Sequence, residues 1–487
     1  MASFIVVKAK KKPNYSPGPP ADPLIGHLRV IPFENQDATF HAWAKEYGKF
    51  RTFLGSDVIH LEALGNHIVV LDSVEAANDL LERRSPIYSD RPHILVFDMV
   101  GMNDIVLMPY GEAFRKYQKF RSLQTKKARA LALNLLENKN RHEMFFNMQV
   151  LYVSSLLTLS DRREFRFATS VITGILYGHQ VVSKDDEYTK LIDHQSMIAV
   201  NLGQPGGALL DILPFPEAFL KYREIDLTHS LSIQYNICSL GSLEQDPREW
   251  RPMFRRVYDY PYEQVEKKMD GGVAEDLILA RVLAKFSTRN SVPEEEIEYV
   301  KLAIGAMYRA AMETVWSFVL TLVGIDKRAQ EEIDLVIGSE RLPEFEDKDS
   351  LPYATALVHE GLRRHPVIPL AIPHRSVQDD VYKGMFIPKG TTILASVMGM
   401  ALDEKTHKNP SVFSPSRFLP KPDGDDEPLV GSAFGFGRRI CPGRHFVLDS
   451  VWMLTAKILT TLDLSAGRDE NGNLAPPPLE FSHTVSR

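Results

Sequence analysis

The clearest pattern of apolar and polar positions lies between residues 300 and 322. Apolar side chains recur there at steps of three and four residues, the spacing of one buried face of an α-helix. The pattern predicts a long helix whose buried stripe is Ile304, Met307, Ala311, Val315, Phe318 and Leu322. Similar spacing predicts helices at residues 38–47, 75–84 and 446–462, from Ser350 onward, and over most of 140–222.

Strand patterns are fewer and shorter. Two runs of β-forming residues, 58–64 and 67–71, flank Gly65-Asn66 and predict a hairpin. Two further strands are predicted at residues 381–387 and 391–397, divided by Pro388-Lys389-Gly390.

Three local signals add detail. Ser350 is expected to cap its helix, with Pro352 in the first turn. Ser89-Asp90-Arg91-Pro92 predicts a break between elements. Residues 223–250 have little periodicity and contain Cys238, so they are either a long loop or a stretch where the translated sequence is imperfect.

Composition narrows the class of protein. The chain has 487 residues, of which 44% are hydrophobic and 25% charged, an ordinary balance for a globular protein with a large core. A formal net charge of −6 is not a signature of nucleic-acid binding, so no nucleic-acid partner is expected. Two cysteines are too few for a disulfide scaffold or a four-cysteine zinc site.

The first 20 residues are expected to form a basic, proline-rich tail and hinge. A short apolar run at residues 4–7 is followed by lysines at positions 8, 10, 11 and 12. Prolines follow at positions 17, 19 and 20. No stretch approaches the roughly 20 apolar residues that span a bilayer. The lysines belong either to a solvated tail or to a membrane-surface contact.

One cysteine lies in a glycine-rich stretch, residues 434–443, directly before the helix predicted at 446–462. Backbone N–H groups at a helix N-terminus stabilise a thiolate. Glycines at 435, 437 and 443 let the backbone close around the sulfur and approach a flat ligand. A thiolate in such a turn is a good ligand for iron, although a lone buried cysteine is more often only a packing residue.

The residues around Cys441 carry a specific pattern. Phe434, Gly437, Arg439, Cys441 and Gly443 fit Phe-x-x-Gly-x-Arg-x-Cys-x-Gly, which resembles the haem-ligand loop of the cytochrome P450 family. The resemblance implies that Cys441 is the axial ligand of a haem b iron. It also implies that the other four residues shape or bind the cofactor.

The long predicted helix carries a second resemblance. Residues 310–314, Ala-Ala-Met-Glu-Thr, are similar to the family's motif on the helix that crosses the distal haem face, with Ala311 where glycine is usual. The resemblance implies that Thr314, with Glu313 and water, delivers protons to oxygen. The alternative is that Thr314 bonds a carbonyl one turn earlier and that Glu313 reaches solvent.

Glu360, Arg363 and Arg417 match a third feature of the family. Glu360 and Arg363 are three residues apart and so share one helix face, and Arg417 lies in an Arg-Phe block before the cysteine. In the family such a glutamate and two arginines form a buried structural triad. Bidentate guanidinium–carboxylate geometry suits this role.

His374 is aligned with a basic residue that binds a haem propionate in the family; the alternative is a hydrogen-bonded surface histidine. Where many members have Trp-x-x-x-Arg for the same purpose, this chain has Phe114 and Gln118. Phe114 cannot donate a hydrogen bond, and Gln118 carries no charge. The surrounding basic residues of 115–121 contact a propionate or a reductase, or form a solvated face.

The resemblance spans roughly residues 13–480 and is strongest to fungal, basidiomycete-like members. It implies a fold that is mainly α with a small β part, with haem between the long distal helix and the cysteine loop. Residues 21–487 would form one domain, with the C-terminal hairpin incomplete and the N-terminal membrane anchor missing. Family members lie at the endoplasmic reticulum membrane, on its cytosolic face.

The implied activity is that of a haem-thiolate monooxygenase of secondary metabolism or xenobiotic oxidation. It would insert one atom of O2 into an apolar small molecule, such as a terpenoid, a steroid-like compound or a polycyclic aromatic. Electrons would come from NADPH through a separate reductase, because no Gly-x-Gly-x-x-Gly dinucleotide motif is evident. Three alternatives stay open: a reductase-independent haem-thiolate isomerase or dehydratase, a non-catalytic haem-binding protein, and an incomplete gene product.

Overall fold

The fold is described from a computed structural model over residues 13–32, 35–48, 57–102, 105–115, 165–179, 181, 185–192, 195, 247–272, 277–288, 291–321 and 327–461. The α-helices within these residues are α1 (Gln36–Tyr47), α2 (Val74–Ala77), α3 (Ser85–Tyr88), α4 (Leu95–Val100), α7 (Phe165–Tyr177), α12 (Arg251–Asp270), α13 (Ile278–Ser287), α14 (Glu294–Thr321), α15 (Arg328–Val336), α16 (Pro352–Arg364), α17 (Val397–Ala401) and α18 (Arg444–Thr461). A π-helical segment, η1 (Asn78–Arg83), continues α2, and short 3-10 helices are η4 (Pro247–Trp250), η6 (Phe345–Ser350), η7 (Pro415–Phe418), η8 (Ser432–Phe434) and η9 (Gly437–Arg439).

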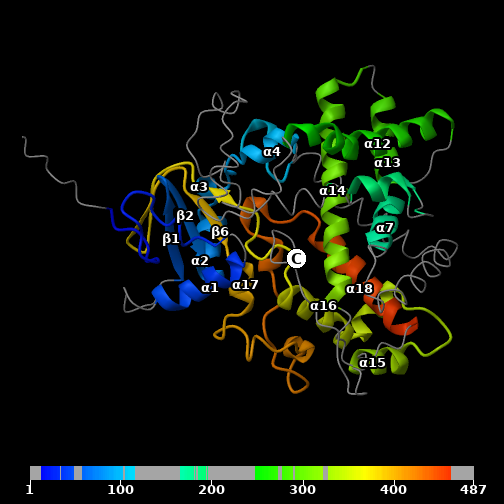
Figure 1. Ribbon diagram of the computed structural model, residues 1–487. Coiled ribbons are helices and arrows are strands. Elements are labelled where there is room, and N and C mark those ends of the chain that lie inside the picture. The colour runs from blue at the N-terminus through cyan, green and yellow to red at the C-terminus, as the bar shows by residue number, and fades with distance from the viewer. Residues whose placement is uncertain are drawn as a thin grey trace, which may run out of the picture.

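The sheet joins an early segment of the chain, residues 58–71, to a late one, residues 374–395. Its strands are β1 (Val58–Ala63), β2 (Asn66–Leu71), β3 (His374–Arg375) and β6 (Thr392–Ala395), in the order β1-β2-β6-β3. β2 pairs with β6 in parallel, and the other pairs are antiparallel. The sheet and α1 lie on one side of the molecule, and the longer helices lie on the other (Figure 1).

The long helix α14 organises the helical side. It packs against α7, α12, α16 and α18 and stands upright at the centre of that side in Figure 1. Ile304, Val315 and Phe318 of the predicted apolar stripe are buried, and Met307 and Ala311 pack against the same core. The prediction of a long helix with one buried face is therefore confirmed over the described residues, of which 321 is the last in this helix.

The predicted cap of α16 is wrong. The helix starts at Pro352 with Leu351 in the cap position, and Ser350 instead ends η6. The carboxylate of Glu332, from α15, accepts hydrogen bonds from the backbone N–H groups of Tyr353 (2.8 Å) and Ala354 (2.9 Å). A side chain from a neighbouring helix therefore supplies the acceptor that a capping serine normally provides.

The stretch predicted as one strand at 381–387 is two strands. β4 (Asp380–Tyr382) and β5 (Met385–Ile387) pair as an antiparallel hairpin. Lys383 and Gly384 form the turn with φ of 48° and 78°. Two consecutive positive φ values are typical of the tight turns whose twist matches a hairpin.

Residues 13–20, predicted as part of the tail, lie against the sheet. The backbone N–H of His60 in β1 donates to the Pro17 carbonyl at 3.0 Å, and the Tyr15 ring stacks on the His60 ring. A Cβ at Gly18 would be 2.3 Å from the His60 carbonyl oxygen, so only glycine allows this approach. Elsewhere in the described chain, no helix is both long and apolar enough to cross a membrane.

The close crossing of α12 over α14 gives a stability prediction. A Cβ at Gly305 would lie 2.3 Å from Tyr258 Cδ1, so Gly305→Ala should force the two helices apart. We expect it to lower the free energy of unfolding by roughly 1–3 kcal/mol, despite alanine's better helix propensity.

Gly271→Ala, at the end of α12, is the matched control because its Cβ would make only ordinary 3.5 Å contacts. Urea unfolding of both variants measures the difference. Equal stability of Gly305→Ala and wild type would show that the helices tolerate a wider crossing.

Candidate functional site

The loop that carries Cys441 is folded by backbone contacts. The Cys441 N–H donates to the Phe434 carbonyl at 2.7 Å, which closes the turn. Gly435 and Gly437 have φ of 74° and 54°, in the left-handed region. A Cβ at Gly437 would lie 2.2 Å from the Leu81 carbonyl oxygen, so the loop rests directly on the backbone of η1.

Cys441 lies just before the first turn of α18. The helix begins at Arg444, and the Val447 N–H donates to the Gly443 carbonyl at 2.8 Å. Cys441 is half-buried and is not part of a disulfide. The sulfur is thus near the N-terminal end of a helix, as the sequence predicts, where the helix dipole favours a thiolate.

Arg439 points from the loop toward residues 89–114. Its guanidinium donates to the carbonyl oxygens of Ser89 (2.9 Å) and Met108 (2.7 Å). Its Cζ lies 3.7 Å from the centre of the buried Phe114 ring. Phe114, which stands where the family usually has a hydrogen-bonding tryptophan, therefore makes a cation–π contact with Arg439. Gln118 lies outside the described residues.

His374 is buried in β3, beside the same region. The Tyr88 carbonyl accepts a hydrogen bond from its Nδ1 at 2.7 Å, so the neutral imidazole carries its hydrogen on Nδ1 and none on Nε2. Burial lowers the pKa of His374 well below its usual range, and the nearby positive charges of Arg91 and Arg439 lower it further.

Arg91 is a buried cation in this region, and the sequence did not single it out. Its guanidinium donates to the carbonyls of Val106 (3.0 Å), Ile372 (2.8 Å) and Pro373 (2.6 Å). Over the described part of the chain, no carboxylate forms an ion pair with Arg91. Burial, together with the charge of Arg439, lowers the pKa of Arg91.

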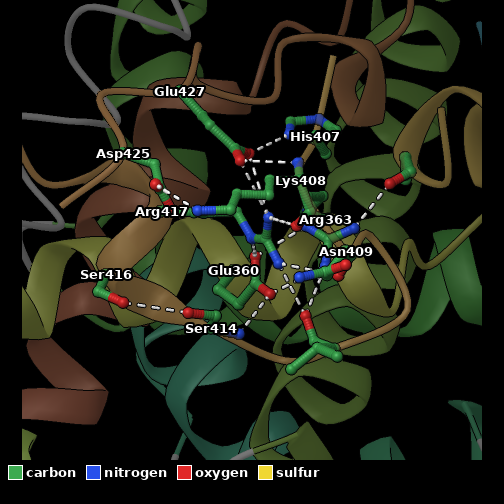
Figure 2. A network of polar contacts seen from close by, with 12 residues as sticks. Glu360, Arg363, His407, Lys408, Asn409, Ser414, Ser416, Arg417, Asp425 and Glu427 are labelled. Carbon is green, nitrogen blue, oxygen red and sulfur yellow. Dashed lines mark hydrogen bonds and ion pairs between the residues drawn. The ribbon is translucent and has the colours of Figure 1, made fainter. Parts of the chain in front are cut away.

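Glu360, Arg363 and Arg417 form one buried network (Figure 2). Glu360 and Arg363 are 0% exposed and Arg417 is 1% exposed. Two nitrogens of Arg363 donate to the two Glu360 oxygens at 2.8 Å each, and Arg417 Nε donates to Oε2 at 3.1 Å. The three residues predicted as a triad are thus together, and every oxygen of the carboxylate has a partner.

The network continues beyond these three residues. Arg417 also contacts Glu427, whose Oε2 accepts a hydrogen bond from His407 Nδ1 at 2.7 Å. The Ser414 N–H donates to Glu360 at 2.7 Å, and Arg363 donates to the Ala401 carbonyl at 2.6 Å. Figure 2 shows how these contacts join α16 to the segment 401–427 that leads toward the cysteine loop.

Glu313 and Thr314 lie near the middle of α14, and both are half-buried. The Thr314 hydroxyl donates to the Ala310 carbonyl at 2.7 Å. This is the backbone bond expected of a packing residue, but the hydroxyl oxygen can still accept a hydrogen bond.

The comparisons with known proteins agree on one family. The family profile described as Cytochrome P450 matches residues 16–482. The chain belongs to the cytochrome P450 family. Similar relatives are cytochrome P450 monooxygenases of the fungi Hericium erinaceus (33% identical, 98% of this chain, 87% of the relative), Rhodocybe pseudopiperita (31%, 100%, 90%) and Armillaria gallica (30%, 96%, 88%).

Membership confirms the resemblance and the fold predicted from the sequence, and it makes the protein a monooxygenase of this family. It also implies a haem, a redox partner and a substrate. The described residues fit a haem: a half-buried cysteine stands before a helix, and the same region holds two arginines, Arg91 and Arg439, and His374. The hydrogen bonds of Arg91 described above end on neutral carbonyls, so the carboxylates of a haem would supply the opposite charge that a buried cation needs.

Arg91 lies in the stretch that the sequence predicts only as a break, Ser89-Asp90-Arg91-Pro92. An arginine beside proline is ordinary in an exposed turn, so composition and spacing do not reveal its role. Its role becomes visible only from its burial in the folded chain, where it contacts the carbonyls of residues 106, 372 and 373.

The Glu360 network gives the prediction of this section. Glu360→Ala removes the carboxylate that pairs with the buried Arg363 and leaves Arg417 with Glu427 alone, which should cost about 3–5 kcal/mol of folding free energy. We expect little haem-loaded protein rather than a slower enzyme.

Glu75→Ala is the control, because Glu75 forms an exposed pair with Lys383 that should contribute within about 1 kcal/mol. Haem content per protein and urea unfolding are measured on both. Stable, haem-replete Glu360→Ala protein would show that the network is not essential.

Proposed function

We propose that the protein binds haem b with Cys441 as the axial ligand and inserts one atom of O2 into an apolar small molecule. The observation that carries this proposal is the arrangement of Arg91, His374 and Arg439 beside the cysteine loop. These two arginines and the histidine are matched to a flat ligand that bears two carboxylates, and the half-buried thiol is matched to its iron.

When bound, the haem would supply the activation of dioxygen. The chain's own residues bind and orient it. Arg91, Arg439 and a protonated His374 would hold the propionates; Phe434 and Gly443 shape the loop around the sulfur. Without haem, burial and the charges of Arg91 and Arg439 lower the pKa of His374, so the imidazole is neutral. A propionate at Nε2 would supply the negative charge that favours protonation, and only the protonated ring can donate there, because Nδ1–H is already donated to Tyr88.

Thr314, together with Glu313, would move protons to the reacting oxygen. The Thr314 hydroxyl can accept a hydrogen bond from water while it still donates to the Ala310 carbonyl. Alternatively, it can rotate away from that carbonyl and donate to the water. The Glu360, Arg363 and Arg417 network would be structural and would hold the segment before the cysteine loop.

The finer identity of the reaction is also proposed. The substrate class is a terpenoid, a steroid-like compound or a polycyclic aromatic, and electrons come from NADPH through a separate NADPH–cytochrome P450 reductase. The location is the cytosolic face of the endoplasmic reticulum membrane. These proposals are supported by membership of the family, by the fungal relatives and by the absence of a dinucleotide motif in the sequence.

Replacement of each cysteine tests the proposal. Cys441→Ala should abolish the thiolate-type absorbance of the reduced, carbon monoxide-bound protein, because it removes the sulfur ligand. Cys238→Ala, which changes the only other cysteine, should retain it. A thiolate spectrum that survives in Cys441→Ala would overturn the assignment.

Replacement of Thr314 separates proton delivery from packing. Thr314→Val keeps the shape but removes the hydroxyl, so haem content should persist while product formed per NADPH consumed falls several-fold. Thr321→Val, on the same helix with a similar backbone bond to Phe318 (2.7 Å), is the matched control.

Both variants are assayed with the same reductase and substrate. An unchanged coupling ratio in Thr314→Val would make Thr314 a packing residue. Turnover without NADPH and reductase would instead favour the isomerase or dehydratase class.

A further inference from the structure

Two side chains of the proposed haem site donate to the backbone of residues 88–91, and a third belongs to that segment. The Tyr88 carbonyl accepts from His374 Nδ1, and the Ser89 carbonyl accepts from Arg439 Nε. Arg91 belongs to the same segment. The positions of Arg91, His374 and Arg439 therefore all depend on where this four-residue backbone lies.

The side chain of Tyr88 anchors this backbone. The Tyr88 ring is 0% exposed, and its hydroxyl donates to Asp380 Oδ2 at 2.9 Å. Asp380 Oδ2 also accepts from Arg84 Nη1 at 2.8 Å, and its Oδ1 accepts from the Val381 N–H at 2.8 Å. Asp380 is thus an acceptor held in place from both sides.

Protonation states favour this bond. Burial raises the pKa of Tyr88, so the hydroxyl keeps its hydrogen. Burial also acts to raise the pKa of Asp380, but the hydrogen bonds from Arg84 and Tyr88 outweigh it and lower that pKa. A neutral phenol therefore donates to an ionised carboxylate, a charge-assisted bond stronger than a neutral one.

Tyr88 is held at its two ends by one short stretch of chain. His374 and Asp380 are six positions apart in the sequence. Between them, the Arg375 N–H donates to the Asp90 carbonyl and the Val377 N–H to the Ile87 carbonyl, both at 2.9 Å. The carbonyl of Tyr88 meets the histidine, and its hydroxyl meets the aspartate.

We propose that the Tyr88–Asp380 hydrogen bond positions His374 and Arg439 toward the haem carboxylates, and thereby sets how tightly haem is held and the reduction potential of its iron. Tyr88 is a positioning residue in this scheme, because it acts through the two cations. The inference rests on the proposed function, in which these cations bind the propionates.

The direction of the effect follows from Coulomb's law. Reduction adds one negative charge to the haem, and a fixed cation nearby stabilises the reduced form. If the 88–91 backbone loosens, His374 and Arg439 are held less firmly against the carboxylates. The reduction potential should then become more negative, and haem should leave faster.

Two tyrosines of similar burial allow a matched experiment. Tyr88→Phe removes only the hydroxyl that binds Asp380. Tyr382 lies in the same strand as Asp380, and its hydroxyl donates to Asp79 Oδ2 at 3.0 Å instead of to a group that holds residues 88–91. Tyr382→Phe removes only that hydroxyl. Phenylalanine at 382 keeps the ring over which Arg84 lies.

We expect haem transfer from Tyr88→Phe to an excess of a haem-scavenging apoprotein to be roughly threefold to tenfold faster than from wild type, the effect of one hydrogen bond. Its reduction potential, from a spectroelectrochemical titration, should be more negative. Tyr382→Phe should match wild type in both measurements, even if thermal unfolding shows a similar loss of stability. If the two variants behave alike, Tyr88 contributes only to stability and the positioning role is wrong.

Two further variants separate this inference from the proposed function. Arg91→Gln and His374→Gln should also release haem faster. If both retain haem as wild type does, the cations do not bind the propionates, and the proposed cofactor site fails together with the inference. If they release haem faster while Tyr88→Phe does not, the cofactor site stands and only the positioning role is overturned.

Discussion

The buried carboxylate of Glu360 is the charge on which the cysteine side of the molecule depends. It satisfies Arg363 and Arg417 at once, and through them the carbonyls and Glu427 of the segment 401–427. A network of this kind contributes little net free energy compared with an apolar core, but the loss of one member leaves charges buried without partners. It therefore specifies one arrangement of the chain that leads into the cysteine loop.

The buried charges fall into two kinds. In the Glu360 network the charges are balanced among protein side chains, so the network is complete by itself. Beside Tyr88 the buried cation Arg91 is held by carbonyl oxygens, which orient it without neutralising its charge. This difference separates residues that hold the fold from residues that are suited to an anionic ligand.

The cysteine loop and the Glu360 pair could be predicted from sequence because their geometry is local. Gly437 stands four positions before Cys441 in the loop motif. Glu360 and Arg363 are three positions apart, which places both side chains on one face of a helix. Arg91 could not be predicted, because its burial depends on residues about 280 positions away. The cap at Ser350 failed for a related reason: Glu332, from another helix, already supplies the acceptor.

The pairing of distant segments has a consequence for synthesis. Tyr88 and His374 are 286 positions apart, Ser89 and Arg439 are 350 apart, and β2 pairs with β6. On the ribosome the first hundred residues emerge long before their partners, so β2 leaves one edge unpaired until β6 follows. Such non-local contacts slow folding and expose a strand edge to other chains in the interval. Both sides of the molecule therefore wait for the last part of the chain, the sheet for β6 and the helices for α18, and the β2 edge stays open to aggregation until β6 has been made.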